Sequence, residues 1–261
     1  MQLKRIMVAT KPWERGLPIG ADHARQLAPS AGVEIEIVGS VFDAAVSAGR
    51  DRGEAAALKS QDRTVAAARA GLERLAASMR DSGARVTTRI VWGVPPYESI
   101  LAAAHDWQAD LLVVGTHEPG TPHTRLTDTD WQLLRRARCP LLLVKSATFS
   151  GYRTILAAVD PLPGCDELDL LDGAVSAASR RVASVCGSAV RAVEGSPARA
   201  VVAAAAHRRA DLVVVAAAHR HGFATAVVGN TAELVAGDLA CDVLIVPVPE
   251  NAPVAATYAQ R

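Results

Sequence analysis

The stretch "AAAHDWQADLLVVG" at residues 102–115 decides the fold, because a close copy, "AAAHRRADLVVVA", stands at residues 204–216. Each copy joins the end of an alanine-rich helical pattern to an Asp-led run of Leu and Val with the length of a buried strand. An order of elements that returns later in one chain indicates an internal repeat. The sequence therefore predicts two domains of one design.

The segments around these two stretches repeat as well. "KRIMVATKP" (4–12) resembles "RTILAAVDP" (153–161), and "CPLLLVK" (139–145) resembles "CDVLIVP" (241–247). A Gly- and Pro-containing element precedes each alanine-rich stretch. The two repeats therefore meet near residues 146–152.

Runs of β-branched residues and Leu alternate with helical patterns, the longest at residues 54–83. Such alternation is typical of βαβ units and a mostly parallel sheet covered on both faces. In the second repeat, one amphipathic helix from Leu168 to Val185 leads almost directly into the next strand. This repeat has lost about one helix–strand unit, so we expect five strands in domain 1 and four in domain 2. The predicted bounds are 1–148 for domain 1, 149–250 for the shortened domain 2 and 251–261 for a flexible tail.

The composition excludes several classes of protein. The 261 residues carry a net charge of +1 and 21% charged side chains, which does not indicate a nucleic-acid binder, a membrane-surface binder or a disordered chain. No apolar run approaches the ~18 residues of a membrane span, and the N-terminus has no signal-peptide core. The four cysteines are far apart and form no CxxC pair. We predict a cytoplasmic protein with reduced, buried thiols.

The paired segments "DLLVVG" and "DLVVVA", the Gly-x-Pro elements and "GNTAELVAGDLACDVLIVPVP" (229–249) resemble the universal stress protein family, in particular its tandem-domain, E-type members. The resemblance implies two tandem open parallel-sheet α/β domains of the adenine nucleotide α-hydrolase-like fold, the second shortened. It also places strands 140–145 and 242–247 at sheet edges. Because an unpaired apolar edge is an aggregation hazard, we expect these strands to pair and to form an intramolecular pseudo-dimer of the two domains.

Nucleotide-binding members of the family carry the motif G-x2-G-x9-G-[S/T] and an Asp at the end of the first strand. The glycines let backbone N–H groups approach phosphate, and the hydroxyl and the helix start donate to its oxygens. In domain 2 the motif positions hold Ala216, His219, Gly229 and Asn230, so two of the three glycines are absent. The weak candidate ligand site of domain 2 comprises Asp160, Ala216, His219, Arg220, Gly222, Gly229, Asn230 and Thr231.

Two interpretations of this segment stay open. His219 and Arg220 could attract an anion, which would make the segment a weakened nucleotide or anion site. Alternatively, the turn is retained only for structure, with Asn230 as N-cap and Glu233 at the N3 position of a capping box. Domain 2 also lacks the second-strand unit that forms one wall of the adenine pocket in nucleotide-binding members of the family.

In domain 1, Gly115 is the only motif glycine that is left. The loop is one residue shorter than in the motif, so the second glycine falls at Glu118 and the last Gly-[S/T] pair at Thr127 and Asp128. Glu118 and Asp128 would put carboxylates where phosphate needs donors, and like charges repel. Lys11 replaces the Asp at the end of the first strand. We therefore expect no ATP binding in domain 1 and interpret residues 128–130 as the first residues of a helix, facing its dipole.

The other reactive side chains form no recognisable site. The histidines at 117, 123, 219 and 221 lack further ligands at metal-site spacing. No GxSxG, no phosphate-binding GxxxxGK[ST] and no Cys–His signature is present. Trp92, Trp107 and Trp131 could line a groove, although aromatic residues more often fill the core. We predict no catalytic residues and no metal ligands.

Together these observations predict a non-catalytic stress-response protein that binds an unknown protein partner or small ligand and needs no cofactor. The alternative is an adenine-nucleotide-binding stress regulator with little or no hydrolysis, with ATP bound in domain 2. Neither nucleic acid nor a membrane is an expected partner. A further homodimer stays open.

Overall fold

The computed structural model of the chain describes most of both repeats. The described residues are 3–11, 19–28, 32–81, 83–116, 126–146, 149, 151–159, 166–194, 198–217, 219–220, 227–228 and 230–247. The expected tail at 251–261 lies outside them.

Nineteen elements follow one another along the described chain. The first half contains β1 (Arg5–Thr10), α1 (Ile19–Leu27), β2 (Glu34–Val41), α2 (Ala44–Asp51), α3 (Ala55–Arg80), β3 (Arg85–Trp92), α4 (Pro96–Asp106), β4 (Leu111–Gly115), α5 (Asp128–Arg136) and β5 (Leu141–Val144). The second half contains β6 (Thr154–Val159), α6 (Asp166–Cys186), β7 (Ala189–Glu194), α7 (Ala198–Arg208), β8 (Leu212–Ala217), β9 (His219–Arg220), β10 (Val227–Val228), α8 (Asn230–Asp238) and β11 (Asp242–Pro247).

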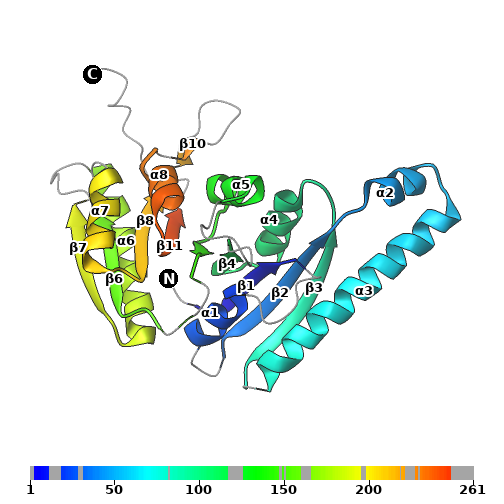
Figure 1. Ribbon diagram of the computed structural model, residues 1–261, viewed down its shortest axis with the longest axis horizontal. Helices are drawn as coiled ribbons and strands as arrows, with labels where there is room; N and C mark the ends of the chain where they lie inside the picture. Colours follow the sequence, from blue (N-terminus) through cyan, green and yellow to red (C-terminus); the bar gives the residue numbers. More distant parts are fainter. Residues whose placement is uncertain are drawn as a thin grey trace.

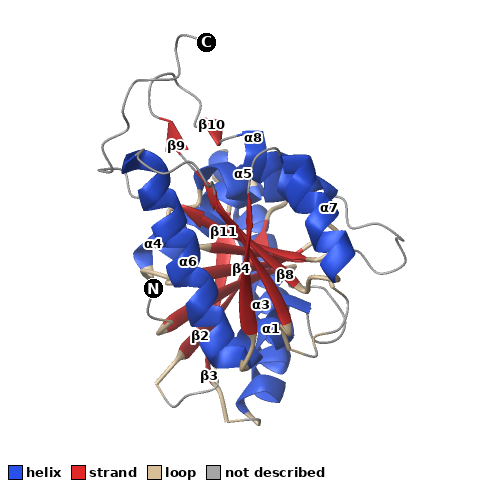
Figure 2. Ribbon diagram, turned by 90° about the vertical axis from the view of Figure 1, so that its left-hand side faces the viewer, coloured by secondary structure: helices blue, strands red, loops and turns tan. Residues whose placement is uncertain are grey.

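Nine of the strands form one sheet in the order β3-β2-β1-β4-β5-β11-β8-β6-β7. Five come from the first half and four from the second, as the sequence predicts. β3 with α3 and β7 with α7 lie at opposite ends of this sheet (Figure 1). The remaining strands, β9 and β10, pair with each other outside the main sheet near α8 (Figure 2). This short ribbon was not predicted.

Helices cover both faces of the sheet. The core on one face takes its buried helical residues from α1, α3 and α6. The core on the other face takes them from α4, α5, α7 and α8. In the second half, α6 alone connects β6 to β7, where the first half has α1, β2, α2 and α3 between β1 and β3. The loss of one helix–strand unit is therefore confirmed. Within the described residues, no helix is long and apolar enough to cross a bilayer.

The aspartate that precedes β4 and its counterpart before β8 have the same structural role. Asp110 Oδ2 accepts the backbone N–H groups of Lys4 and Arg5, each at 2.9 Å. In the second half, Asp211 Oδ2 accepts the N–H groups of residues 153 and 154, each at 2.8 Å. Each carboxylate thus satisfies backbone donors at the start of the neighbouring parallel strand and helps to fix its register.

The turns before these aspartates also match. Gln108 and Arg209 have positive φ angles, 52° and 49°. In both turns the next residue donates its N–H to the carbonyl five residues earlier, Ala109 to Ala104 and Ala210 to Ala205. This is the helix ending in which a left-handed residue follows the last turn, a position that favours glycine.

Substitution of Gln108 or Arg209 by Gly should therefore raise the free energy of unfolding by about 0.5–1 kcal/mol, because glycine removes the Cβ strain of the left-handed conformation. Ala206→Gly, at an exposed helical position of α7, is the matched control and should lower it by about 1 kcal/mol. Urea denaturation of the three variants measures these changes in the free energy of unfolding. Destabilisation by Gly at both turn positions would contradict this account.

The two halves are joined where β5 pairs with β11. This is the antiparallel contact in an otherwise parallel sheet, with Val243 opposite Leu143 and Ile245 opposite Leu141. The two strands expected to pair thus do so. Beside them, Arg135 of α5 binds the Glu233 carboxylate of α8 through two contacts, at 2.8 and 3.3 Å.

A buried polar cluster lies at one end of the β5–β11 contact, with Asp242 at its centre. Oδ1 of Asp242 accepts the N–H of Lys145 at 2.8 Å and both the N–H and the hydroxyl of Ser146 at 3.0 Å. Oδ2 accepts the hydroxyl of Tyr152 at 2.9 Å and lies 3.0 Å from Nε2 of His23. The side chains of His23 and Asp242 are completely buried. The cluster therefore connects α1, β5, the segment between the halves and β11.

The groups around Asp242 stabilise its carboxylate form. Burial acts to raise the pKa of Asp242, but the hydrogen bond and charge of His23 and the N–H groups of Ser146 and Lys145 outweigh it, so the pKa of this carboxyl lies below its usual value. Lys145 is also buried, which lowers the pKa of its amine. Its Nζ donates to the carbonyls of Ala236 and Leu239 at the end of α8, where a helix dipole favours a cation.

Asp242→Asn should lower the free energy of unfolding at neutral pH by about 3–5 kcal/mol, because the amide of Asn puts its own N–H donors against the buried donors that now converge on the carboxylate. The folded-state pKa of Asp242 is depressed, so its stabilisation is complete above the unfolded value of about 3.9 and is lost as the pH falls through the folded value. The difference between wild type and variant should therefore shrink below about pH 4. Denaturant titrations at several pH values, with the exposed Asp62→Asn as control, measure this. A difference that grows toward acid would contradict the assignment.

Candidate functional site

The candidate nucleotide position of the first half lies at the carboxyl ends of β1 and β4, which are parallel neighbours. Ligands of open parallel sheets usually bind at these ends. Lys11 directly follows β1, Gly115 ends β4, and α5 starts at Asp128. The loop between, residues 117–125, lies outside the described part of the chain, and Glu118 with it.

The start of α5 is closed by its own side chains. The Thr127 hydroxyl accepts the N–H of Asp130 at 3.3 Å, and the Asp130 carboxylate accepts the N–H and the hydroxyl of Thr127 at 2.7 and 2.9 Å. This is a reciprocal capping box. Thr127 occupies the position of the last motif glycine, so the backbone donor at that position already has an acceptor.

Asp130 supplies the negative charge that this helix start favours. Its side chain is buried, which raises its pKa, while the hydrogen bonds of Thr127 and the charge of Lys11 act in the opposite direction. A phosphate placed here would compete with this carboxylate for the same donors and would be repelled by it. The arrangement gives the N–H groups of Thr127 and Asp130 acceptors within the chain itself.

The structure refines the prediction for this segment. Residues 128–130 do begin a helix, as expected. However, the carboxylate that binds the helix start is the buried Asp130 and not Asp128, which is exposed. The Thr-x-x-Asp spacing was the available signal, because Asp can replace the usual Glu or Gln of a capping box.

The chain on either side of Gly115 is also held by internal contacts. A Cβ on Gly20, in the first turn of α1, would lie 3.4 Å from the nitrogen of Gly115, so this turn packs closely on the end of β4. The N–H and hydroxyl of Thr116 both donate to the carbonyl of Val144, at 2.8 and 3.0 Å. These contacts direct the chain from β4 toward β5.

The candidate site of the second half is only partly described. β6 and β8 are parallel neighbours, and Ala216 lies partly exposed near the carboxyl end of β8. His219 and Arg220 form β9, and Asn230 and Thr231 begin α8; the directions of these four side chains are not described. Asp160, Gly222 and Gly229 lie outside the described residues. The fold thus brings the end of β6, the end of β8 and the start of α8 to one edge, and the site itself stays a prediction.

Glu233 has a partner that its spacing from Asn230 does not predict: both of its carboxylate oxygens accept from Arg135 of α5. Its role in a capping box with Asn230 stays a prediction. The sequence spacing alone suggested a local contact, whereas pairing of the two halves brings an arginine from 98 residues away. Glu233 therefore belongs to the contact between the halves.

Trp92, Trp107 and Trp131 do not line one groove. Trp92 lies against Phe42 at the ends of β2 and β3, with ring centroids 6.1 Å apart. Trp131 of α5 packs on α8, where a Cβ on Gly237 would come within 3.4 Å of its ring. Trp107 is a partly buried neighbour of the core beneath α4. The core interpretation fits these positions.

The described cysteines are free thiols of low reactivity. Cys139, Cys186 and Cys241 are partly buried, and burial raises the pKa of all three thiols, to about 11 for Cys139 and about 12 for Cys241. Such thiols carry little thiolate at neutral pH. Cys165 lies outside the described residues, as do His117, His123 and His221.

A parallel α/β unit with helices on both faces of its sheet occurs twice, and the two copies are joined through their terminal strands, which defines a tandem α/β protein. The chain belongs to the universal stress protein family: the family's sequence profile matches residues 2–145 and, a second time, residues 166–247. The expected resemblance and its tandem form are confirmed.

Its relatives include proteins named universal stress protein E. That of Salmonella typhi is 23% identical over 227 residues, which cover 65% of this chain and 71% of that protein. The one from Photorhabdus laumondii is 32% identical, but over only 85 residues, 31% of this chain and 26% of that protein. The protein of Escherichia coli K12 is 23% identical over 64% of this chain and 69% of its own length.

Solved structures show the same fold. A universal stress protein structure from Pseudomonas aeruginosa UCBPP-PA14 has a TM-score of 0.73 and 22% identity, with 94% of each chain covered. One from Archaeoglobus fulgidus DSM 4304 has a TM-score of 0.67 and 12% identity, with 95% of this chain and 99% of that chain covered.

Thr127→Ala should lower the free energy of unfolding by about 1 kcal/mol, because the start of α5 loses its side-chain acceptor and Asp130 loses one donor. Thr127→Ser, which keeps the hydroxyl, is the matched control and should be nearly neutral. Thermal unfolding of both variants tests the difference. Equal stability of the two variants would show that the capping box does not hold the helix start.

Proposed function

We propose that this protein is a non-catalytic stress-response protein that acts by binding a small ligand or a protein partner, and that its first half does not bind ATP. It needs no cofactor for this role and works in the cytoplasm. The two halves act as an internal pseudo-dimer, in which the terminal strands β5 and β11 pair with each other. Nucleic acid and membranes are not its partners, in keeping with a net charge of +1.

One observation carries this proposal. In the first half, Asp130 accepts the N–H and hydroxyl of Thr127 at the helix start where the family's motif would place phosphate donors. A buried carboxylate in this position supports a structural role for the segment. The loss of two motif glycines in the second half supports the same conclusion there.

The alternative function is an adenine-nucleotide-binding stress regulator with little or no hydrolysis, with its site in the second half. The convergence of the ends of β6 and β8 with the start of α8 favours that location over the first half. In this case Asp160 would contact the nucleoside and Arg220 the phosphates. The second half has one strand, β7, outside β6, where the first half has two outside β1, so less protein surrounds the base.

Identification of the ligand that copurifies with the protein separates the two functions. The full chain is denatured, and the released small molecules are analysed by mass spectrometry. Absence of adenine nucleotides, together with no saturable binding of added ATP, agrees with the proposed function. Stoichiometric ATP would establish the alternative. Photolabelling with 8-azido-ATP then locates the site, and labelled peptides from residues 1–148 would contradict the role assigned to Asp130.

Restoring the motif of the second half gives a sharper prediction. The triple substitution Ala216→Gly, His219→Gly and Asn230→Ser should raise ATP affinity by less than about tenfold, or about 1.4 kcal/mol, because the missing strand unit is not restored. Calorimetric titration of wild type and variant with ATP, AMP and sulfate measures the change. A much larger rise for ATP alone would show that the glycines are the limiting defect.

A further inference from the structure

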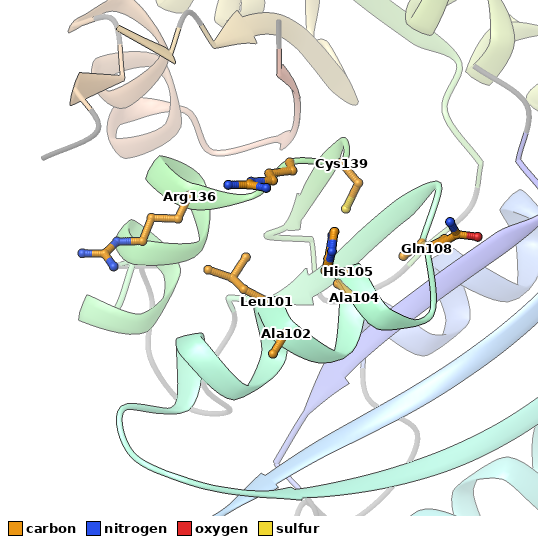
Figure 3. A pocket seen from close by; sticks show the side chains of 9 residues that line it. Leu101, Ala102, Ala104, His105, Gln108, Arg136 and Cys139 are labelled. Carbon is orange, nitrogen blue, oxygen red and sulfur yellow. The ribbon is translucent and has the colours of Figure 1, made fainter. Parts of the chain in front are cut away.

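A cleft of about 520 Å³ lies between the second half of α4 and the connection from α5 to β5 (Figure 3). It is at the amino ends of β4 and β5, because α4 leads into β4 and Cys139 leads into β5. The candidate nucleotide positions are at the carboxyl ends of the strands. The cleft is therefore a separate place on the molecule, and its volume is typical of small-ligand pockets.

The lining combines an apolar floor with a cationic rim. Leu101, Ala102 and Ala104 of α4 form the floor. His105 and Cys139 point toward one another across the cleft, and Arg136 marks one end of it (Figure 3). Arg138 also lines the cleft, and the described residues that line it include no carboxylate. Such a lining attracts a negative charge and offers contact area to an apolar group.

The two arginines of the cleft differ from their neighbour in sequence. Arg135 is bound by Glu233, but within the described residues no carboxylate forms an ion pair with Arg136 or Arg138. The Arg136 guanidinium lies 5.1 Å from the ring centroid of Tyr97, an interaction that limits its freedom. Two exposed cations that pair with no carboxylate of the described residues are thus brought to one cleft.

A purely structural role accounts for part of this arrangement. The carbonyl ends of α4 and α5 lie near the cleft, and a cation in the last turn of a helix, such as Arg136, offsets their partial negative charge. Arg138 follows the end of α5 and is exposed, so it adds a charge beyond the last turn. The surplus charge is what a bound anion would neutralise.

We propose that this cleft binds a small organic anion, a carboxylate or phosphate carried on a short apolar or aromatic group. Arg138 and His105 contact the anion, and Arg136 adds to the positive field at one end. The apolar part lies on Leu101, Ala102 and Ala104. The biological role of this cleft rests on the proposed ligand-binding function. The cleft itself is a different site from the candidate nucleotide positions.

The test uses 4-phenylbutyrate and phenyl phosphate as probes, titrated into the full chain by calorimetry. Saturable binding of at least one probe at one site per chain is expected, weakened by added salt. The double variant Arg136→Gln/Arg138→Gln should lose affinity by about tenfold or more, because charge-assisted hydrogen bonds are removed. The exposed arginines of α6 and α7 provide the control, Arg180→Gln/Arg208→Gln, which should bind as wild type does.

A second pair of variants tests the cleft without touching its arginines. Ala102 is an exposed helical position in the floor, so Ala102→Glu places a carboxylate there and should abolish binding, while Ala102→Gln should change affinity less than about threefold. This pair decides the outcome if the double arginine variant does not fold. Chemical-shift changes on α4 and at residues 136–139 should accompany binding.

Three results would overturn the proposal: no saturable binding of either probe, binding that neither set of variants changes, or equal binding of the neutral 4-phenylbutanol. ATP is included as a competitor. If ATP binds without displacing the probes, the proposal that the protein acts without ATP is contradicted, whereas the proposal that the cleft binds an organic anion is not. If neither ATP nor the probes bind, only the proposal that the cleft binds an organic anion is contradicted.

Discussion

The Asp242 carboxylate is the group on which the union of the two halves depends. A buried carboxylate is costly unless its charge and both oxygens are satisfied. Its donors come from α1, from the end of β5 and from the segment between the halves, so all are in place only when the halves are docked. The cluster thus favours one arrangement of the β5–β11 contact over shifted ones, as cooperative buried networks do.

The same contact determines what the neighbouring helices can do. With β5 and β11 paired, α5 and α8 lie close enough for Arg135 to bind Glu233 and for Trp131 to pack against Gly237. Both helices begin at the edge where the family's phosphate motif would lie. In α5 the start is satisfied by Thr127 and Asp130, and part of α8 is committed to the contact between the halves. Stability at this edge is therefore achieved with protein groups, which supports a binding role other than ATP binding.

Two ends of the sheet consequently have different characters. At the carboxyl ends of β1 and β4, Thr116 donates to the carbonyl of Val144, and Thr127 and Asp130 bind one another. At the amino ends of β4 and β5, Arg136 and Arg138 form no ion pair with a carboxylate in the described part of the chain. The arginines that could bind an anion thus lie at the opposite end of the strands from the usual ligand position of open α/β sheets. The turn at Gln108, which is strained by its positive φ, lies at this second end.

The sequence by itself determined the repeat, the strand count of each half, the shortened second half and the pairing of the terminal strands, because these follow from local periodicity and from the need to cover apolar edges. It also indicated that residues 128–130 start a helix. Only the tertiary structure decided that Glu233 binds Arg135 of the other half, and that Asp242 would bind groups up to 219 positions away, such as His23. The cleft beside α4 likewise joins residues of two helices. Local spacing cannot reveal such contacts, because the distance between side chains of different elements is set by how the sheet and its helices pack.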